Sequence, residues 1–125
     1  MPNLKEKAIT LLNSTNVSLA ADADTVLYTV PTGKRCILTN GILVVGADAG
    51  TSMISIGQNS SETDFAPYNM LAAINAAYDT AIIMPVPNTS TTLTKSYPAG
   101  TVIEARVSSN AGGAANTLFL YGMIY

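Results

Sequence analysis

Short segments in which apolar and polar residues alternate, separated by turn signals, constrain the fold of this 125-residue chain most. Alternation with a period of two is typical of β-strands, and Gly- and Pro-containing turns interrupt it. The expected strands are residues 25–30, 34–45, 51–57, 78–84, 89–97, 101–107 and 117–125. Because strands and helices do not alternate, a parallel α/β sheet is not expected. The sequence predicts an all-β fold, an antiparallel jelly-roll-like β-sandwich of about seven or eight strands.

Two of these segments carry a more specific expectation. Residues 34–45 are rich in branched side chains and long enough for a core strand, and Gly41 within them predicts a bulge or bend. Residues 51–57 follow after a short Gly-containing loop, so the two segments form a plausible hairpin. Residues 117–125 are apolar on both faces, as a strand covered on both sides would be.

The middle of the chain leaves its secondary structure open. Residues 58–64 are polar and are expected to form a loop. Residues 70–77 have helix propensity and would fit two or three helical turns, but an extended path fits equally well. The sequence therefore does not decide between helix and extended chain over residues 66–77.

The first residues differ from the rest of the chain. Leu4, Leu11 and their neighbours permit one short amphipathic helix, which Asn13 to Asn16 would stop. We therefore divide the chain into an N-terminal arm, residues 1–24, and a β-sandwich domain, residues 25–125. Two interpretations of the arm remain open, since it can be a strand or helix that packs on its own domain or an arm that docks onto a neighbouring subunit.

The residue inventory excludes several classes of function. The chain has no histidine and one cysteine, so a Ser-His-Asp or Cys-His nucleophile, the usual zinc sites and an internal disulfide are all absent. We expect no enzyme and no small-molecule substrate. A net charge of −2 argues against nucleic-acid binding, and no apolar run approaches the ~20 residues of a membrane span. Only 11% of residues are charged, which suits uncharged packing against other subunits.

Two close acidic pairs are the strongest metal candidates in the sequence. They are Asp22 with Asp24, and Glu62 with Asp64. Calcium takes six to eight oxygen ligands, and neither pair has enough carboxylates around it in the sequence. We interpret the pairs as turn or capping residues and expect no metal and no cofactor. Cys36, in the middle of an expected strand, is interpreted as a small buried apolar residue.

Two stretches resemble a known group of proteins. Tyr28-Thr-Val-Pro-Thr-Gly-Lys-Arg-Cys-Ile-Leu-Thr-Asn-Gly-Ile-Leu43 resembles the opening of small β-sandwich virion proteins of tailed bacteriophages. Tyr97-Pro-Ala-Gly-Thr-Val-Ile-Glu-Ala-Arg-Val107, followed by a Gly-rich loop and an apolar last strand, resembles their closing strands. The resemblance covers roughly residues 25–125. It implies a phage particle component, since the group includes capsid decoration (cement) proteins, head fibres and tail or baseplate proteins, commonly trimeric.

From this resemblance we expect a decoration protein that binds the major capsid protein and stabilises the outer capsid surface. It would be a homotrimer on the virion, made in the host cytoplasm. The expected capsid-binding arm residues are Leu4, Lys5, Lys7, Ile9 and Leu11, and the expected subunit interface residues are Tyr121, Met123 and Tyr125. The alternative is a tail, baseplate or head-fibre protein with a receptor- or carbohydrate-binding role. Its candidate contacts are Asp48, Glu62, Asp64 and Tyr68.

Overall fold

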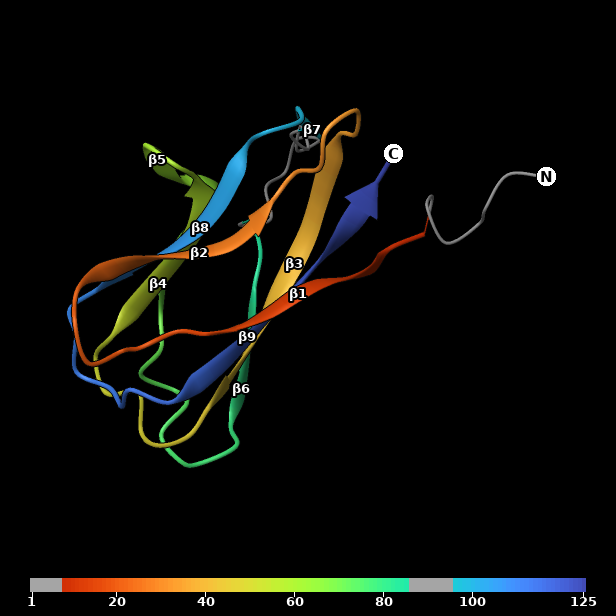
Figure 1. The fold of residues 1–125 in the computed structure, drawn as a ribbon. Coiled ribbons are helices and arrows are strands. Elements are labelled where there is room, and N and C mark those ends of the chain that lie inside the picture. The colour runs from red at the N-terminus through yellow and green to blue at the C-terminus, as the bar shows by residue number, and fades with distance from the viewer. Residues whose placement is uncertain (1–7, 86–95) are drawn as a thin grey trace, which may run out of the picture.

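The computed structural model of the chain describes residues 8–85 and 96–125. These residues form strands and connecting loops and no helix, arranged as two antiparallel sheets that face one another (Figure 1). The strands are β1 (Thr10–Asn16), β2 (Ala23–Thr29), β3 (Cys36–Val45), β4 (Met53–Gln58), β5 (Ser61–Met70), β6 (Thr80–Ile83), β7 (Ser96–Tyr97), β8 (Val102–Ser108) and β9 (Asn116–Ile124). The predicted all-β sandwich is confirmed.

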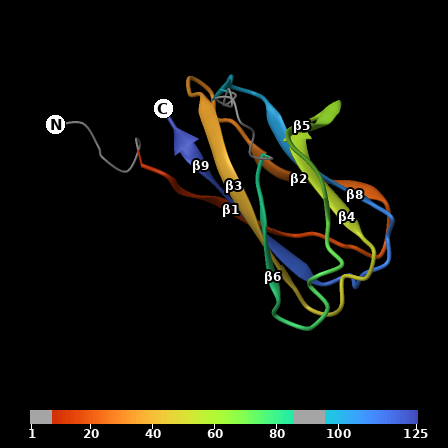
Figure 2. The same ribbon diagram turned by 180° about the vertical axis from the view of Figure 1, so that it is seen from behind.

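The first sheet has the order β1-β9-β3-β6, and the short β7 pairs with the beginning of β3. β9 lies between β1 and β3, so the last strand of the chain is central in its sheet. β1 and β6 form the two edges, which are both visible when the molecule is turned (Figure 2). Most of the expected segment 89–97 lies outside the described residues, and only its end is seen, as β7.

The second sheet has the order β2-β8-β4-β5. β8 shows the predicted alternation, because Ile103, Ala105 and Val107 are buried between the sheets. Glu104 is also almost completely buried, although it belongs to the opposite side of the strand. The burial of this carboxylate has to be explained by what lies around it, since an ionised group is costly to remove from water.

The core lies between the two sheets and is apolar. The largest fully buried side chains are Val17, Leu19, Leu27, Leu38, Leu43, Ile54, Ile56, Leu71, Ile83, Ile103, Leu118 and Leu120. Gly41 permits close packing of the sheets, because a Cβ there would lie 2.9 Å from Ile56 Cδ1 and 3.1 Å from Leu118 Cδ1. The irregularity of β3 occurs at residues 38–40 instead, so the bulge expected at Gly41 is displaced toward the beginning of the strand.

The expected hairpin between residues 34–45 and 51–57 is wrong. Both segments are strands, but β3 belongs to the first sheet and β4 to the second. The loop between them therefore crosses from one sheet to the other. The local signal for two strands and a short loop does not distinguish a hairpin from such a crossing, because the choice depends on which distant strands pair.

The region from residue 58 to residue 77 consists of a strand followed by turns, and it contains no helix. The expected loop over 58–64 reduces to a tight turn at Asn59 and Ser60, after which β5 begins. Residues 71–79 contain turns and no helix, and Leu71 and Ile74 are buried there. Anchoring these two apolar side chains in the core holds the segment against the sandwich.

The helix expected in the N-terminal segment is wrong in its described part, since Thr10–Asn16 form β1. β1 pairs with β9 along its length, and the Asn13 side chain donates a hydrogen bond to the Leu27 carbonyl at 2.7 Å. Val17 and Leu19, which follow β1, are completely buried. From Thr10 onward, the segment that we assigned to an arm is thus part of the sandwich.

Candidate functional site

The two sheets differ completely in charge. The five strands of the first sheet contain no Asp, Glu, Lys or Arg. The strands of the second sheet carry Asp24, Glu62, Asp64, Glu104 and Arg106. Each sheet buries one side in the same core, so the contrast concerns the outward sides. We call the outward side of the first sheet the charge-free face.

Strand register places large apolar side chains next to one another on the charge-free face. Ile82, Ile42 and Phe119 form a row across β6, β3 and β9. Ile37 lies beside Met123 in a second row. The members of the face are Leu11, Ser14, Asn16, Ile37, Asn40, Ile42, Val44, Thr80, Ile82, Thr117, Phe119, Tyr121 and Met123. Their neighbours along β9, such as Leu118 and Leu120, point into the core.

Several large apolar residues of the molecule are exposed on or beside this face. The exposed fraction is 62% for Ile82 and 49% for Leu11. Met84, just after β6, and Tyr125, just after β9, are also exposed. A contiguous apolar area of this kind is unusual on a monomeric soluble protein and is typical of an interaction surface.

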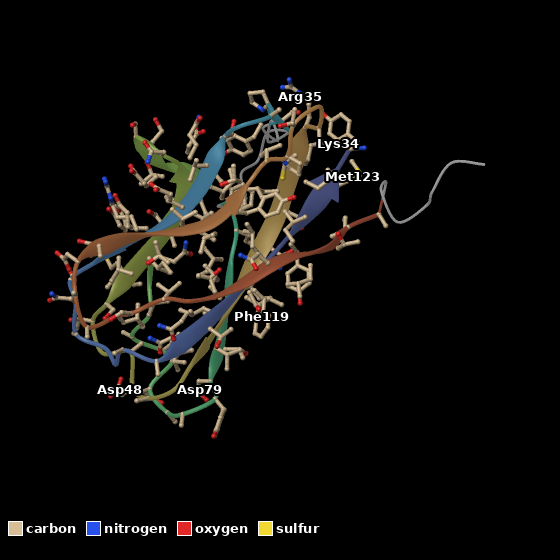
Figure 3. All side chains as sticks on the ribbon, viewed as in Figure 1. Lys34, Arg35, Asp48, Asp79, Phe119 and Met123 are labelled. Carbon is tan, nitrogen blue, oxygen red and sulfur yellow. The ribbon has the colours of Figure 1, made fainter. Side chains whose placement is uncertain are left out.

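Opposite charges lie at the two ends of the first sheet. Lys34 and Arg35 directly precede β3, and Figure 3 shows them at one end, near Met123. Asp48 and Asp79 lie in the loops at the other end of β3 and β6, beyond Phe119. The charge-free face therefore has one positive and one negative end.

Hydrogen bonds hold the side chains of Arg35, Asp48 and Asp79 at the two ends. The Arg35 guanidinium donates from Nε to Ser96 Oγ at 2.9 Å and from a terminal nitrogen to the Ser96 carbonyl at 3.1 Å. Asp48 accepts a hydrogen bond from the Gly50 N–H at 2.8 Å, and Asp79 accepts one from the Ala76 N–H at 3.2 Å. These hydrogen bonds fix the orientation of the three side chains relative to the first sheet.

The structure brings several of the predicted interface residues together. Tyr121 and Met123 lie on the charge-free face, and Tyr125 lies at its positive end, with its hydroxyl 2.7 Å from Ser96 Oγ. Leu11, predicted as an arm residue, shares this face because it pairs with Tyr121. Ile9 is exposed just before β1. The other predicted arm residues, Leu4, Lys5 and Lys7, lie outside the described residues.

A second grouping lies in the second sheet. One carboxylate oxygen each of Asp24, Glu62 and Glu104 lies within 4.8 Å of the other two, and we call these three residues the acidic cluster. They come from β2, β5 and β8. The cluster takes one member from each acidic pair of the sequence and adds Glu104. Asp64 stays outside it, and its carboxylate accepts hydrogen bonds from Gln58 and Tyr97.

A glycine in β4 makes the acidic cluster possible. β4 separates β5 from β8, and its Gly57 pairs with Glu104. A Cβ at Gly57 would lie 2.2 Å from the Ser61 carbonyl oxygen and 2.7 Å from the Glu62 carbonyl carbon. Because Gly57 has no side chain, β5 approaches closely and Glu62 meets Glu104 across β4. Sequence spacing gives no signal for this approach.

Arg106 neutralises part of the acidic cluster. Its Nε lies 2.7 Å from Asp24 Oδ1, and a terminal nitrogen lies 2.9 Å from Asp24 Oδ2 and 3.2 Å from Glu62 Oε1. The hydrogen bonds from Arg106 lower the pKa of Asp24 below its usual value, and the same contacts raise the pKa of Arg106. Glu104 accepts one hydrogen bond, from Asn59 to Oε2 at 3.2 Å. Its Oε1 is buried and has no hydrogen-bond partner.

The receptor-binding alternative predicted contacts from Asp48, Glu62, Asp64 and Tyr68. Three of these belong to β5, whereas Asp48 lies in the loop that follows β3 of the other sheet. The structure therefore does not gather all four around one site.

Cys36 is fully buried beneath the first sheet, and burial raises the pKa of its thiol to about 11. The thiol is protonated near neutral pH, so it lacks the thiolate that a nucleophile requires. Burial also raises the pKa of Tyr97, which pairs with Cys36, to about 12. Both groups therefore belong to the packed interior.

No known protein family, curated protein or solved structure matches this chain. No helix among the described residues is long and apolar enough to cross a membrane. Two arrangements in the structure invite a functional interpretation. The charge-free face is suited to packing against protein, and the acidic cluster is suited to holding positive charge.

Proposed function

We propose that this chain is a structural subunit of a phage particle, of the capsid-decoration type, without catalytic activity. In this proposal it forms a homotrimer and binds the major capsid protein on the outer surface of the shell. The resemblance of residues 25–125 to small β-sandwich virion proteins suggests the particle. The observation that carries a role in assembly is the charge-free face.

The size of the charge-free face is appropriate for a subunit contact. Four strands spaced ~4.8 Å apart, with lengths up to ten residues at ~3.4 Å each, span roughly 20 by 30 Å. The relief of the side chains adds to this flat area of about 600 Å². A standard interface buries about 800 Å² from each partner, so the face and its exposed margins supply a comparable area.

Charge at the ends of the face favours a particular arrangement of neighbouring copies. The positive end, Lys34 and Arg35, attracts the negative end, Asp48 and Asp79, of the next copy. Contacts of this head-to-tail kind close into a ring when the rotation between copies permits it, and a trimer is such a ring. The apolar rows between the ends then lie against the neighbour and away from water.

The arm contributes the contact with the capsid in this proposal. Lys5 and Lys7 would meet acidic capsid surface, while Leu4, Ile9 and Leu11 would supply apolar contacts. Leu11 also borders the charge-free face, so the arm and the subunit contact are adjacent there. Binding to the assembled shell stabilises it by mass action, because the free energy of the bound state falls with each occupied site.

The subunit contact is tested by measuring the mass of the full chain in solution by light scattering. We expect three times the 13.0 kDa chain mass for the wild type. Phe119→Glu places a charge in the middle of the face and should give a monomer. Thr63→Glu, at an exposed position in β5, is the matched control and should leave the trimer intact. A monomeric wild type, or a Phe119→Glu trimer, contradicts the proposal.

A charge exchange tests the arrangement of the copies. Reversing the positive end with Lys34→Glu and Arg35→Glu should weaken the trimer at low salt. Combining it with Asp48→Lys and Asp79→Lys should restore the trimer, since the ends are again opposite. Failure of the combined variant to recover would contradict the head-to-tail contact.

The place in the particle is tested by the copy number of the chain in purified virions. Decoration requires a copy number comparable with that of the major capsid protein. A few copies per particle would instead support the tail, baseplate or head-fibre alternative.

A further inference from the structure

The acidic cluster has a spacing that one metal ion can bridge. Ca²⁺ binds oxygen ligands at about 2.3–2.6 Å, so two ligands on opposite sides of the ion lie about 5 Å apart. The three carboxylate oxygens lie within 4.8 Å of one another. Mg²⁺ keeps several of its waters and usually binds through one or two carboxylates. A set of three carboxylates therefore suits Ca²⁺ better than Mg²⁺.

The charge balance of the acidic cluster also requires a cation or protons. Three ionised carboxylates against the single positive charge of Arg106 leave two negative charges in excess. Arg106 bonds to Asp24 and Glu62, and neither of its contacts reaches Glu104. Glu62 and Glu104 are 7% and 6% exposed, so water screens this excess charge poorly. One divalent cation brings the balance to zero.

One buried carboxylate oxygen of Glu104 has no hydrogen-bond partner. Buried carboxylate oxygens are normally hydrogen-bonded, and one left without a partner carries a desolvation cost. Oε1 of Glu104 is such an atom. Because Glu104 belongs to the acidic cluster, a bound ion would supply the missing partner.

We propose that Asp24, Glu62 and Glu104 bind one divalent cation, with Ca²⁺ as the best fit. The Asn59 side-chain nitrogen donates to Glu104 Oε2 and holds this carboxylate in place, and water would complete the oxygen ligands. The Arg106 side chain is 43% exposed, which leaves it room to turn outward from Glu62 as the ion enters. The ion links β2, β5 and β8 and thus ties together three strands of the second sheet.

The test is thermal unfolding of the full chain in CaCl₂ and in EDTA. Binding to the folded state alone should raise Tm of the wild type by about 5 °C or more when Ca²⁺ is far above its dissociation constant. MgCl₂ should give a smaller shift. Glu104→Gln, which preserves shape and removes the charge, should abolish the Ca²⁺ shift. Asp22→Asn removes an exposed carboxylate outside the cluster and should retain the shift.

Two results would overturn the proposal. One is a wild-type Tm that is equal in CaCl₂ and EDTA, with no Ca²⁺ binding heat in calorimetry. The other is a Ca²⁺ shift of equal size in Glu104→Gln. If Glu104→Gln raises Tm by the same amount in both buffers, removing the buried charge stabilises the chain independently of Ca²⁺ and the metal site is refuted. Should Glu104→Gln fail to fold, Glu62→Gln is measured in the same way with the same expected loss.

Discussion

The two sheets of this sandwich share one core but differ on their outward sides. The first sheet has no charged residue in any of its strands, whereas the second has five. An outward side that faces water normally carries charged and polar side chains, as the second sheet does. The first sheet instead carries rows such as Ile82, Ile42 and Phe119. The difference indicates that the two sheets are adapted to different surroundings.

β9 carries apolar residues on both of its sides, but only one side faces the core. Residues 117–125 were expected to be covered on both sides because they are apolar on both faces. In the structure one side, with Leu118 and Leu120, faces the core, and the other, with Phe119 and Tyr121, forms part of the charge-free face. Coverage of the second side stays a prediction, and it is the one on which the proposed trimer depends.

The largest expected effect is the loss of stability on truncating a core-facing residue of β9, compared with an outward-facing one. Leu118→Ala leaves a cavity in the core and should reduce the free energy of unfolding by about 2–5 kcal/mol. Phe119→Ala, on the neighbouring outward position, should cost the isolated monomer far less. Urea unfolding at dilutions where the chain is monomeric measures both. Equal losses would show that the two sides of the strand do not differ in burial.

The pH dependence of stability tests the burial of Cys36, which lies on the core side of the first sheet. Burial raises the pKa of Cys36 from 9.0 to about 11, so the folded state binds the thiol proton more tightly than the unfolded state. The contribution of Cys36 to stability is therefore constant below pH 9 and falls between pH 9 and pH 11, by about 3 kcal/mol at ~1.4 kcal/mol per pKa unit. Urea unfolding across this range should show the loss. Cys36→Ala should show a smaller loss; an unchanged loss would assign it to other groups.

Substitution of one glycine in each sheet tests how closely neighbouring atoms approach the strand. A Cβ at Gly41 meets the flexible end of Ile56, whereas one at Gly57 meets the backbone of Ser61 at 2.2 Å. Gly41→Ala should cost about 1 kcal/mol and Gly57→Ala about 3 kcal/mol, since backbone yields less easily than a side-chain end. Unfolding midpoints of the two variants test this order. The reverse order would contradict the close approach of β5 and β4.

The smallest effect is expected on the outward side of the second sheet. The Asp24 and Arg106 side chains are 35% and 43% exposed, so solvent screens their ion pair. Asp24→Asn should lower Tm at pH 7 by only about 3 °C or less. Because Arg106 lowers the pKa of Asp24, the contribution is present above about pH 4 and is lost as pH falls through the folded-state pKa. The difference between variant and wild type should therefore shrink in acid.

Local sequence patterns predicted the strands but did not predict which strands pair with one another. Strands over 25–30 and 101–107 were predictable because alternation depends only on neighbouring residues. The separation of β3 and β4 into different sheets was not, since pairing is decided by residues far apart in the chain. The N-terminal segment forms a strand from Thr10 onward because pairing with β9 outweighs the weak helical propensity of residues 10–12.

The same limit applies to the candidate sites. Tyr121 and Met123 were predicted from the last strand, but Ile42 and Ile82 join them only through the register of three strands. The acidic cluster was missed because the two sequence pairs were judged separately. The close approach of β5 to β4 at Gly57, which brings Glu62 to Glu104, depends on strand pairing that the sequence pattern does not show.

The central claim is that the charge-free face is covered by protein and the outward side of the second sheet is not. Thiol labelling of Ser14→Cys on that face and of Thr63→Cys in β5 tests it most directly, with Cys36 buried in both. Each variant is labelled at a concentration where it is assembled and again after dilution to monomer. We predict that assembly slows labelling of Ser14→Cys at least tenfold and leaves Thr63→Cys unchanged. Equal labelling of Ser14→Cys in both states would contradict the claim.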